Sequence, residues 1–285
     1  MAWNSPHLVT TEWLADHLAD PDVAILDGSW HLPPENRDAG AEFCLRHIPG
    51  AQFFDINAIA DVASGLPHML PSDAQFADAV GRMGIGNGAN VVVYDTRGLF
   101  SAARVWWTFR VMGHDRVAVL DGGLPKWLAQ GRAVAAGPAR KAPAQTFVVH
   151  RNNGLVRDLA GVRALLGSPA VQLVDARPTP RFTGGQPEPR PGLTQGHMPG
   201  ARNLPFTQLL NANGTLKSEA DLRSALAAAG VDAAKPVVAS CGSGVTASMV
   251  ALALALLGRP DTAVYDGSWA EWGRDAGNPV ATGPA

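Results

Sequence analysis

The chain of 285 residues lacks most of the features that would assign it to a metal, a nucleic acid or a membrane. It has two cysteines, and its cysteines and histidines do not stand at the close spacing of a zinc site. Its formal net charge is −2, without a dense run of lysine or arginine, which argues against nucleic acid or an anionic membrane as a partner. The longest apolar run, residues 249–257, is too short to cross a bilayer. We therefore expect no metal, no nucleic acid and no membrane, and no motif indicates a cofactor.

The first residues, Met1 to Pro6, have neither the basic head nor the apolar segment of a secretory signal. We therefore expect a cytoplasmic protein, in which thiols stay reduced. The two cysteines, Cys44 and Cys241, are then free, and Cys44 is interpreted as a packing residue of a helix. Chemistry is expected at Cys241.

Short buried strands alternate with helical segments in both halves of the chain. Strands are expected at residues 23–27, 91–95 and 117–120, and again at 171–175 and 237–241. This alternation predicts α/β units, each with a mainly parallel central sheet flanked by helices on both faces.

The second half repeats the first. Matching pairs are the strand-end acids Asp27 and Asp175, the His-x-Pro-Gly-Ala turns starting at His47 and His197, the capping serines Ser72 and Ser218, and the Asp-Gly turns at Asp121 and Asp266. They recur at offsets of about 145 to 150 residues, as a tandem duplication requires. We expect an N-terminal domain over 1–136, a linker over 137–154 that begins with a proline- and glycine-rich stretch, and a C-terminal domain over 155–285.

Cys241 stands at the end of a strand, and residues 242–246 form a short loop before a helical segment at 247–257. Backbone amides of such a loop and of the first helical turn point inward and favour an anion, here a thiolate. Gly242 and Gly244 allow the loop to curl, because glycine tolerates positive φ. The alternative is a buried, inert thiol.

The corresponding position of the first copy is Asp95, whose loop lacks the Gly-x-Gly spacing. An aspartate cannot carry sulfur, so only the second copy is expected to be chemically active. The first copy is expected to contribute residues to the mouth of the site instead.

With its two copies, its His-x-Pro-Gly-Ala turns and Cys-Gly-Ser-Gly-Val-Thr at 241–246, the sequence resembles the rhodanese superfamily of sulfurtransferases over nearly its whole length. Within it, the loop is similar to that of 3-mercaptopyruvate sulfurtransferases, whereas thiosulfate sulfurtransferases typically carry Cys-Arg-Lys-Gly-Val-Thr. Thiosulfate bears charge next to the transferred sulfur, so cations in the loop are useful. Mercaptopyruvate bears its charge on a more distant carboxylate, which suits the neutral Gly242 and Ser243.

The resemblance implies a two-step reaction in which Cys241 takes sulfur as a persulfide and an acceptor removes it. It implies that Arg181 and Arg190 bind the substrate carboxylate and carbonyl, and that Ser243 donates a hydrogen bond or relays a proton, although turn chemistry alone would also explain a loop serine. The remaining loop residues, Gly242, Gly244, Val245 and Thr246, are assigned to substrate binding, and Thr246 also fits a loop-closing or capping hydroxyl.

A serine, histidine and aspartate are proposed to assist proton transfer in some members of the superfamily. His68 matches the histidine, with pocket lining as the other interpretation. The aspartate position holds Asn57, and an amide cannot act as a base, which argues against a complete relay.

The implied partners are 3-mercaptopyruvate as sulfur donor and a thiol such as thioredoxin, or cyanide, as acceptor. The internal duplication favours a monomer. Thiosulfate as main donor and a non-catalytic binding module remain alternatives. A cysteine phosphatase is excluded, because it needs an arginine six positions after the nucleophile, where this chain has Ala247.

Overall fold

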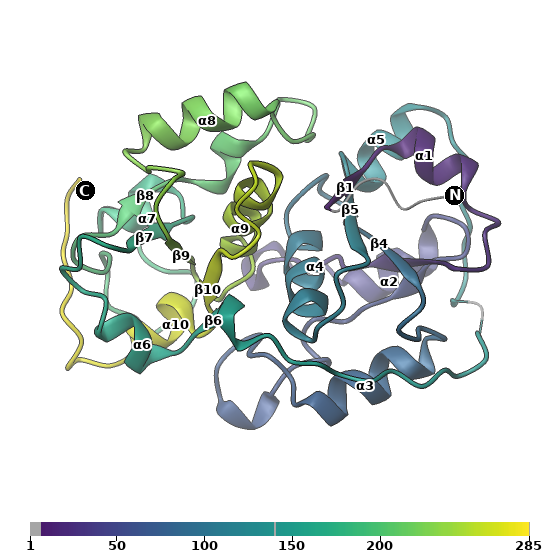
Figure 1. Ribbon diagram of the computed structural model, residues 1–285, viewed down its shortest axis with the longest axis horizontal. Helices are drawn as coiled ribbons and strands as arrows, with labels where there is room; N and C mark the ends of the chain where they lie inside the picture. The colour runs from purple at the N-terminus through teal and green to yellow at the C-terminus, as the bar shows by residue number, and fades with distance from the viewer. Residues whose placement is uncertain (1–6, 140, 285) are drawn as a thin grey trace. The chain divides into compact units, whose positions relative to one another are not determined.

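The computed structural model describes residues 7–139 and 141–284, so the N-terminal segment Met1 to Pro6 lies outside the described residues (Figure 1). The chain divides into two compact units. The first comprises the chain up to Asp61, with Leu70–Asn152 and Ala212–Leu216, and the second comprises Val62–Met69, Asn153–Asn211 and Lys217–Ala285. Two short segments thus fold with the unit of the opposite half of the sequence.

The first unit contains a five-stranded parallel sheet in the order β1-β5-β4-β2-β3. Its strands are β1 (Leu8–Val9), β2 (Val23–Asp27), β3 (Gln52–Phe53), β4 (Asn90–Tyr94) and β5 (Val117–Leu120). The central strands β4 and β5 are wholly buried, as expected of parallel strands covered on both faces.

The second unit repeats this sheet strand for strand, in the order β6-β10-β9-β7-β8, again all parallel. Its strands are β6 (Val156–Arg157), β7 (Gln172–Asp175), β8 (Arg202–Asn203), β9 (Val237–Ser240) and β10 (Ala263–Tyr265). The predicted duplication and parallel α/β architecture are confirmed.

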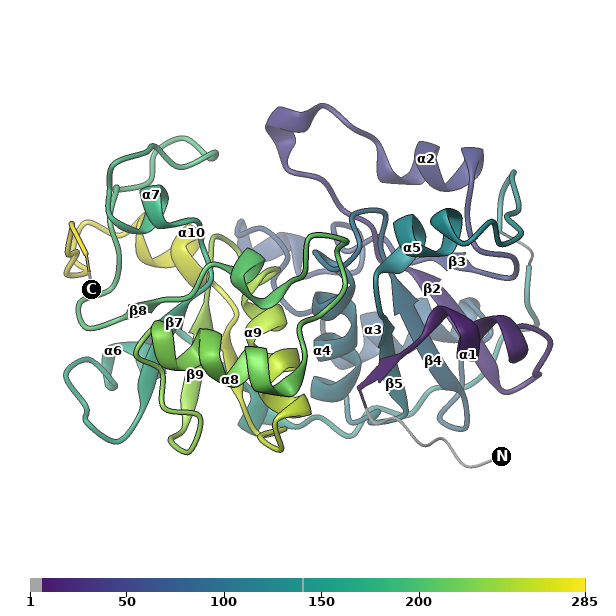
Figure 2. The same ribbon diagram turned by 90° about the horizontal axis from the view of Figure 1, so that it is seen from above.

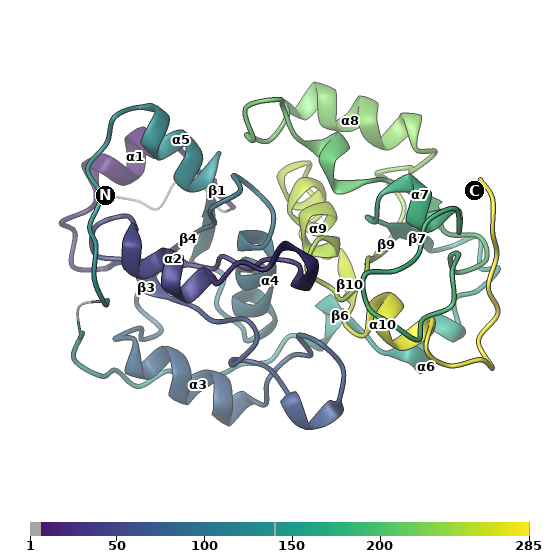
Figure 3. The ribbon, with the colours of Figure 1, turned by 180° about the vertical axis from the view of Figure 1, so that it is seen from behind.

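Helices flank both faces of each sheet (Figures 1, 2 and 3). The first unit has α1 (Thr11–Asp16), α2 (Ala39–Leu45), α3 (Asp73–Arg82), α4 (Ala102–Val111) and α5 (Gly123–Ala129), with short 3-10 turns at Pro33–Glu35 and Val62–Ser64 in the same half of the sequence. The second half has α6 (Leu159–Arg163), α7 (Thr179–Phe182), α8 (Glu219–Ala228), α9 (Ala247–Leu256) and α10 (Ser268–Trp272), with 3-10 turns at Asn153–Leu155 and Phe206–Leu209. No helix among the described residues is long and apolar enough to cross a membrane.

Sequence-local signals set several of these helix starts. Ser72 and Gln75 form the predicted capping box at the start of α3, each side chain bonding the other residue's backbone N–H. Thr10 caps α1 by accepting from the Trp13 N–H. The tryptophans that recur with the duplication are buried, as expected of core residues; they are Trp106, Trp107, Trp127, Trp269 and Trp272.

The repeated histidine turns are built alike. His47 stacks on Phe43 and bonds its carbonyl through Nδ1 at 2.8 Å, and His197 does the same with Phe182 at 2.9 Å. Both imidazoles are buried, so each His-x-Pro-Gly-Ala motif is a structural anchor within its unit.

The expectation for Cys44 is wrong. It lies in α2, but its side chain is exposed, and the buried member of that helix is Phe43. A seven-residue helix presents few residues to a core, and Cys44 follows directly after the inward-facing Phe43, which turns it toward solvent. Both cysteines are free.

Asp27, the acid at the end of β2, is fully buried. The Ser29 N–H donates to its Oδ1 at 2.9 Å, and no positive partner accompanies it in the described residues, unlike Asp175 of the second unit, which pairs with Arg177. Burial raises the pKa of Asp27 to about 6, although hydrogen bonds from Ser29 and Tyr94 lower it.

Asp27→Asn is therefore expected to remove a pH-dependent loss of stability. At pH values below about 4 the carboxyl is protonated in both states, and its contribution to stability is complete. As the pH rises through about 6, the unfolded chain ionises freely while the folded carboxyl does not, so the native state loses about 3 kcal/mol. The stability of the variant relative to the parent should grow by about this amount between acidic and neutral pH, as measured by urea denaturation. A difference that does not change with pH would contradict this account.

Candidate active site

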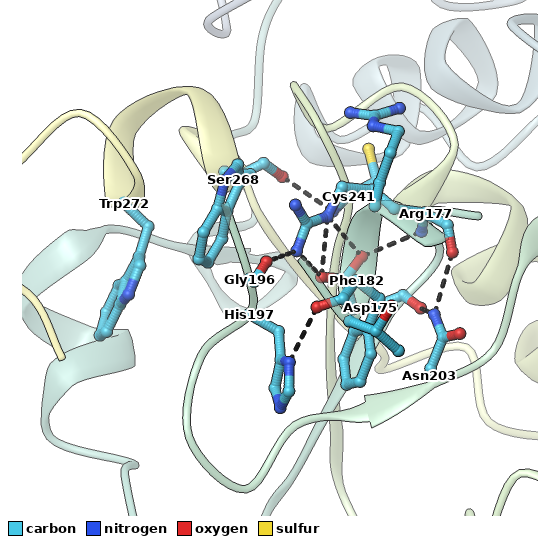
Figure 4. Close-up of polar contacts among 12 residues, drawn as sticks. Asp175, Arg177, Phe182, Gly196, His197, Asn203, Cys241, Ser268 and Trp272 are labelled. Atoms are coloured by element: carbon cyan, nitrogen blue, oxygen red, sulfur yellow. Dashed lines mark hydrogen bonds and ion pairs between the residues drawn. The ribbon is translucent and has the colours of Figure 1, made fainter. Parts of the chain in front are cut away.

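Cys241 follows directly after β9, at the carboxyl edge of the second sheet, where ligands of open α/β sheets bind. Helix α10 braces it (Figure 4): the Cys241 N–H donates to Ser268 Oγ at 3.2 Å, and the Cys241 carbonyl accepts from the Trp269 N–H at 3.0 Å. The residue is 2% exposed. These contacts use the backbone of Cys241 and do not involve its thiol.

The cysteine loop, residues 241–246, contains two glycines, and the structure explains the absence of a side chain differently at each. Gly244 has φ of +75°, the left-handed conformation that was expected. Gly242 does not have positive φ, so that part of the expectation is wrong for it. A Cβ at Gly242 would lie 2.9 Å from Nη2 of Arg181, so a side chain at this position would have to displace a guanidinium.

The structure brings Ser243 and His68 together. Ser243 Oγ lies 3.0 Å from Nδ1 of His68, and both residues are buried. His68 comes from Val62–Met69, the segment of the first half that folds with the second unit, where the Gly65 carbonyl accepts from Arg274 at 3.2 Å. His68 has φ of +62°, a conformation that is costly for a residue with a side chain and that clusters at functional sites.

Arg181, on the short helix α7, is held by Glu188. Its Nε donates to Glu188 Oε1 at 3.2 Å, and its Nη2 donates to Oε2. The Glu188 side chain is 2% exposed, whereas that of Arg181 is 14% exposed. A buried carboxylate therefore fixes the guanidinium beside the cysteine loop.

Glu188 is part of a longer ion-pair network (Figure 4 shows its inner part). Arg177 donates to Glu188 Oε1 at 2.7 Å, to Asp175 Oδ2 at 2.6 Å and to the Gly196 carbonyl at 2.8 Å. Its guanidinium also lies 4.3 Å from the centre of the Trp269 ring. The network runs from the end of β7 to Arg181, so the sheet positions the arginine.

Arg190 lies in the electrostatic field of the same groups. Burial lowers the pKa of Arg190, and the neighbouring charge of Arg181 lowers it further, whereas Cys241 and Glu188 raise it. The structure therefore brings Arg181 against the cysteine loop and places Arg190 within electrostatic range of Cys241 and Arg181.

The other loop residues have structural positions. Val245 is buried, and Thr246 is the N-cap residue of α9. Its side chain makes no capping hydrogen bond, so the expected capping hydroxyl is wrong; its φ and ψ are helical, and a capping side chain needs an extended residue. Asn57 belongs to the first unit, where its N–H donates to Asp55 Oδ1 at 2.8 Å.

Sequence reasoning missed the ion-pair network and the bracing serine. Asp175 was recognised as a strand-end acid, and Glu188 lies between the two predicted arginines, but their pairing with Arg177 was not foreseen. The available signal was the presence of Glu188 and Arg177 near Arg181 in a loop that otherwise carries little charge. Ser268 gave no local signal, since its role depends on a contact between β9 and α10.

The matching loop of the first unit shows what such amides bind. Asp95 occupies the position of Cys241, and its Oδ2 accepts from the N–H groups of Phe100, Ser101 and Ala102 at 2.7 to 2.9 Å. Its Oδ1 accepts from the Arg97 N–H at 2.9 Å. The loop and helix start thus surround an anion, here the chain's own carboxylate.

The family model for the rhodanese-like domain matches the chain twice, over residues 10–130 and 158–275. The chain belongs to the rhodanese family. The resemblance seen in the sequence is therefore confirmed, and each match covers four strands of one sheet, with the short edge strands β1 and β6 just outside. The described residues of this rhodanese-family chain contain no group of three or more His, Cys, Asp or Glu side chains that could hold a metal.

Relatives of two kinds are equally similar. The 3-mercaptopyruvate sulfurtransferase of Homo sapiens is 46% identical over 271 residues, covering 93% of this chain and 91% of the relative. The thiosulfate sulfurtransferase of Bos taurus is 47% identical over 272 residues, with the same coverage. The crystal structure of SseA from Escherichia coli, described as a 3-mercaptopyruvate sulfotransferase, matches with a TM-score of 0.85 and 39% identity over 94% of this chain and all of that one.

Proposed function

We propose that this rhodanese-family chain transfers sulfur from 3-mercaptopyruvate, through a persulfide on Cys241, to a thiol or cyanide acceptor. The observation that carries the proposal is the pairing of an uncharged Gly242–Ser243 loop with Arg181 beside it. A donor whose charge lies away from its sulfur suits this arrangement. Overall identity does not choose between donors, because relatives named for either donor are equally similar.

In the proposed first step the Cys241 thiolate attacks the thiol sulfur of 3-mercaptopyruvate. The S–S bond forms as the C–S bond breaks, and the electron pair of the C–S bond passes to carbon, giving the enolate of pyruvate. Protonation of the enolate releases pyruvate. In the second step an acceptor thiolate or cyanide attacks the outer sulfur, and the electron pair of the S–S bond returns to Cys241 as thiolate.

The surrounding residues have roles that match charge development in these steps. Arg181 and Arg190 would bind the keto acid by its carboxylate and carbonyl, and bidentate pairing would orient the C–S bond. The amides of the cysteine loop would stabilise the anionic sulfur, as the amides of the first unit's loop stabilise the carboxylate of Asp95. Ser243, bonded to His68, would pass a proton to the leaving enolate.

The deciding experiment compares two donors with the same acceptor. We expect kcat/KM for 3-mercaptopyruvate to exceed that for thiosulfate by at least about tenfold, because thiosulfate finds no cation in the loop. Pyruvate release and thiocyanate formation measure the two reactions. Preference for thiosulfate would favour the alternative donor, and turnover of neither would favour a binding module.

Three further expectations belong to this proposal. Thioredoxin is a candidate acceptor, the chain acts as a monomer, and it resides in the cytoplasm. Activity coupled to thioredoxin reductase, light scattering and imaging of a tagged chain test them in turn.

A further inference from the structure

The guanidinium of Arg181 lies close to Gly242 of the cysteine loop. A Cβ built on Gly242 would lie 2.9 Å from Nη2 of Arg181 and 3.9 Å from its Cζ. Real Cβ atoms are essentially never found within 3.0 Å of a heavy atom, so one partner would have to move, and the cost of that movement depends on how firmly the Arg181 side chain is held. The guanidinium therefore occupies the space that a side chain at 242 would need.

The backbone does not itself require glycine at this position. Gly242 is absent from the glycines with positive φ, whereas Gly244 is among them. Alanine at 242 would be free of backbone strain, and its cost would come from the neighbouring guanidinium alone. This separates position 242 from position 244.

Arg181 is not free to move aside. Both its Nε and its Nη2 donate to Glu188, which is buried and also bonded to Arg177. Displacing Arg181 would leave a buried carboxylate oxygen without one of its cationic partners, which is strongly unfavourable. Arg177 is itself committed to Asp175, so the network offers no easy rearrangement.

We propose that Glu188 locks Arg181 into the space left open by Gly242, and that this lock, in addition to the missing loop charge, determines selectivity for a keto-acid donor. The inference rests on the proposed function. Glu188 is a positioning residue, because it acts through Arg181. Donor selectivity then depends on Gly242, Arg181 and Glu188. A side chain at position 242 would change this selectivity first by displacing the guanidinium of Arg181.

The test is the substitution Gly242→Ala, which adds one methyl group and no charge. We expect kcat/KM for 3-mercaptopyruvate to fall by about tenfold or more, mainly through KM, and that for thiosulfate to change by less than about threefold. In an Arg181→Ala background the same substitution should cost less than about twofold, because the clash is gone. An equal cost in both backgrounds would overturn the proposal.

Gly185→Ala is the matched control. Gly185 is exposed, does not have positive φ, and a Cβ there would make only ordinary contacts at 3.6 Å. Gly185→Ala should leave kcat/KM for 3-mercaptopyruvate and for thiosulfate unchanged.

A crystal structure of Gly242→Ala supplies a readout that does not depend on the donor. Arg181 should be shifted or detached from Glu188, and an unmoved guanidinium would refute the lock. If the parent protein does not turn over 3-mercaptopyruvate, the proposed function fails, while the structure of the variant still decides whether position 242 controls Arg181.

Discussion

Cys241→Ser is expected to abolish sulfur transfer, lowering kcat/KM for 3-mercaptopyruvate by at least about 10⁴-fold. A serine hydroxyl does not ionise near neutral pH and cannot form a persulfide. The fold should persist, because the contacts of Cys241 with Ser268 and Trp269 use its backbone. Pyruvate release measures the loss, and mass spectrometry after donor exposure should find one added sulfur on the Cys241 peptide of the parent and none on the variant.

The chain provides its own control for this experiment. Cys44 is the other cysteine, and it is exposed on α2 in the first unit. Cys44→Ser should retain full activity and the added sulfur at Cys241. Sulfur on the Cys44 peptide, or residual turnover by Cys241→Ser, would mean that the loop does not carry the reaction.

Strands β2, β4, β5, β7 and β9 could be predicted closely because local pattern and tertiary environment agree for them, whereas the short strands β1, β3, β6, β8 and β10 were not predicted. The apolar runs at 23–27 and 117–120 are strands with those bounds, since parallel strands covered on both faces read as continuous apolar segments. The duplication extended this reading to the second half. The assignment of residues 62–69 and 212–216 to the unit of the opposite half could not be predicted, because nothing in their sequence indicates which unit they fold with.

For the candidate site, the sequence identified the residues that face the substrate in the proposal and missed those that hold them. Cys241, Arg181 and Arg190 carry motif and charge signals. Glu188 and Arg177 act through pairing in three dimensions, which spacing does not specify. The role of Gly242 was misassigned to backbone freedom for the same reason: the guanidinium that excludes a side chain there comes from residue 181, about 60 positions earlier.

The carboxyl group of Asp95 is expected to contribute to the stability of the first unit. The carboxylate is 1% exposed and accepts four backbone N–H groups, three of them at the start of α4. In the second unit the equivalent position holds the sulfur of Cys241. In the first unit the loop amides therefore bind a side-chain carboxylate and have a structural role.

Asp95→Ala is accordingly expected to destabilise the first unit by about 3 to 5 kcal/mol, because it leaves several buried N–H donors without their acceptor. Asp95→Asn should cost less than alanine, since its amide oxygen can still accept while its NH₂ group opposes at least one donor. Urea denaturation measures both, with the exposed Asp16→Ala as a control that should change stability by less than about 0.5 kcal/mol. A loss below about 1 kcal/mol for Asp95→Ala would show that the loop amides do not depend on the carboxylate. The stated losses would mean that the first copy, whose loop has no cysteine, depends on a carboxylate at this position to satisfy its loop amides.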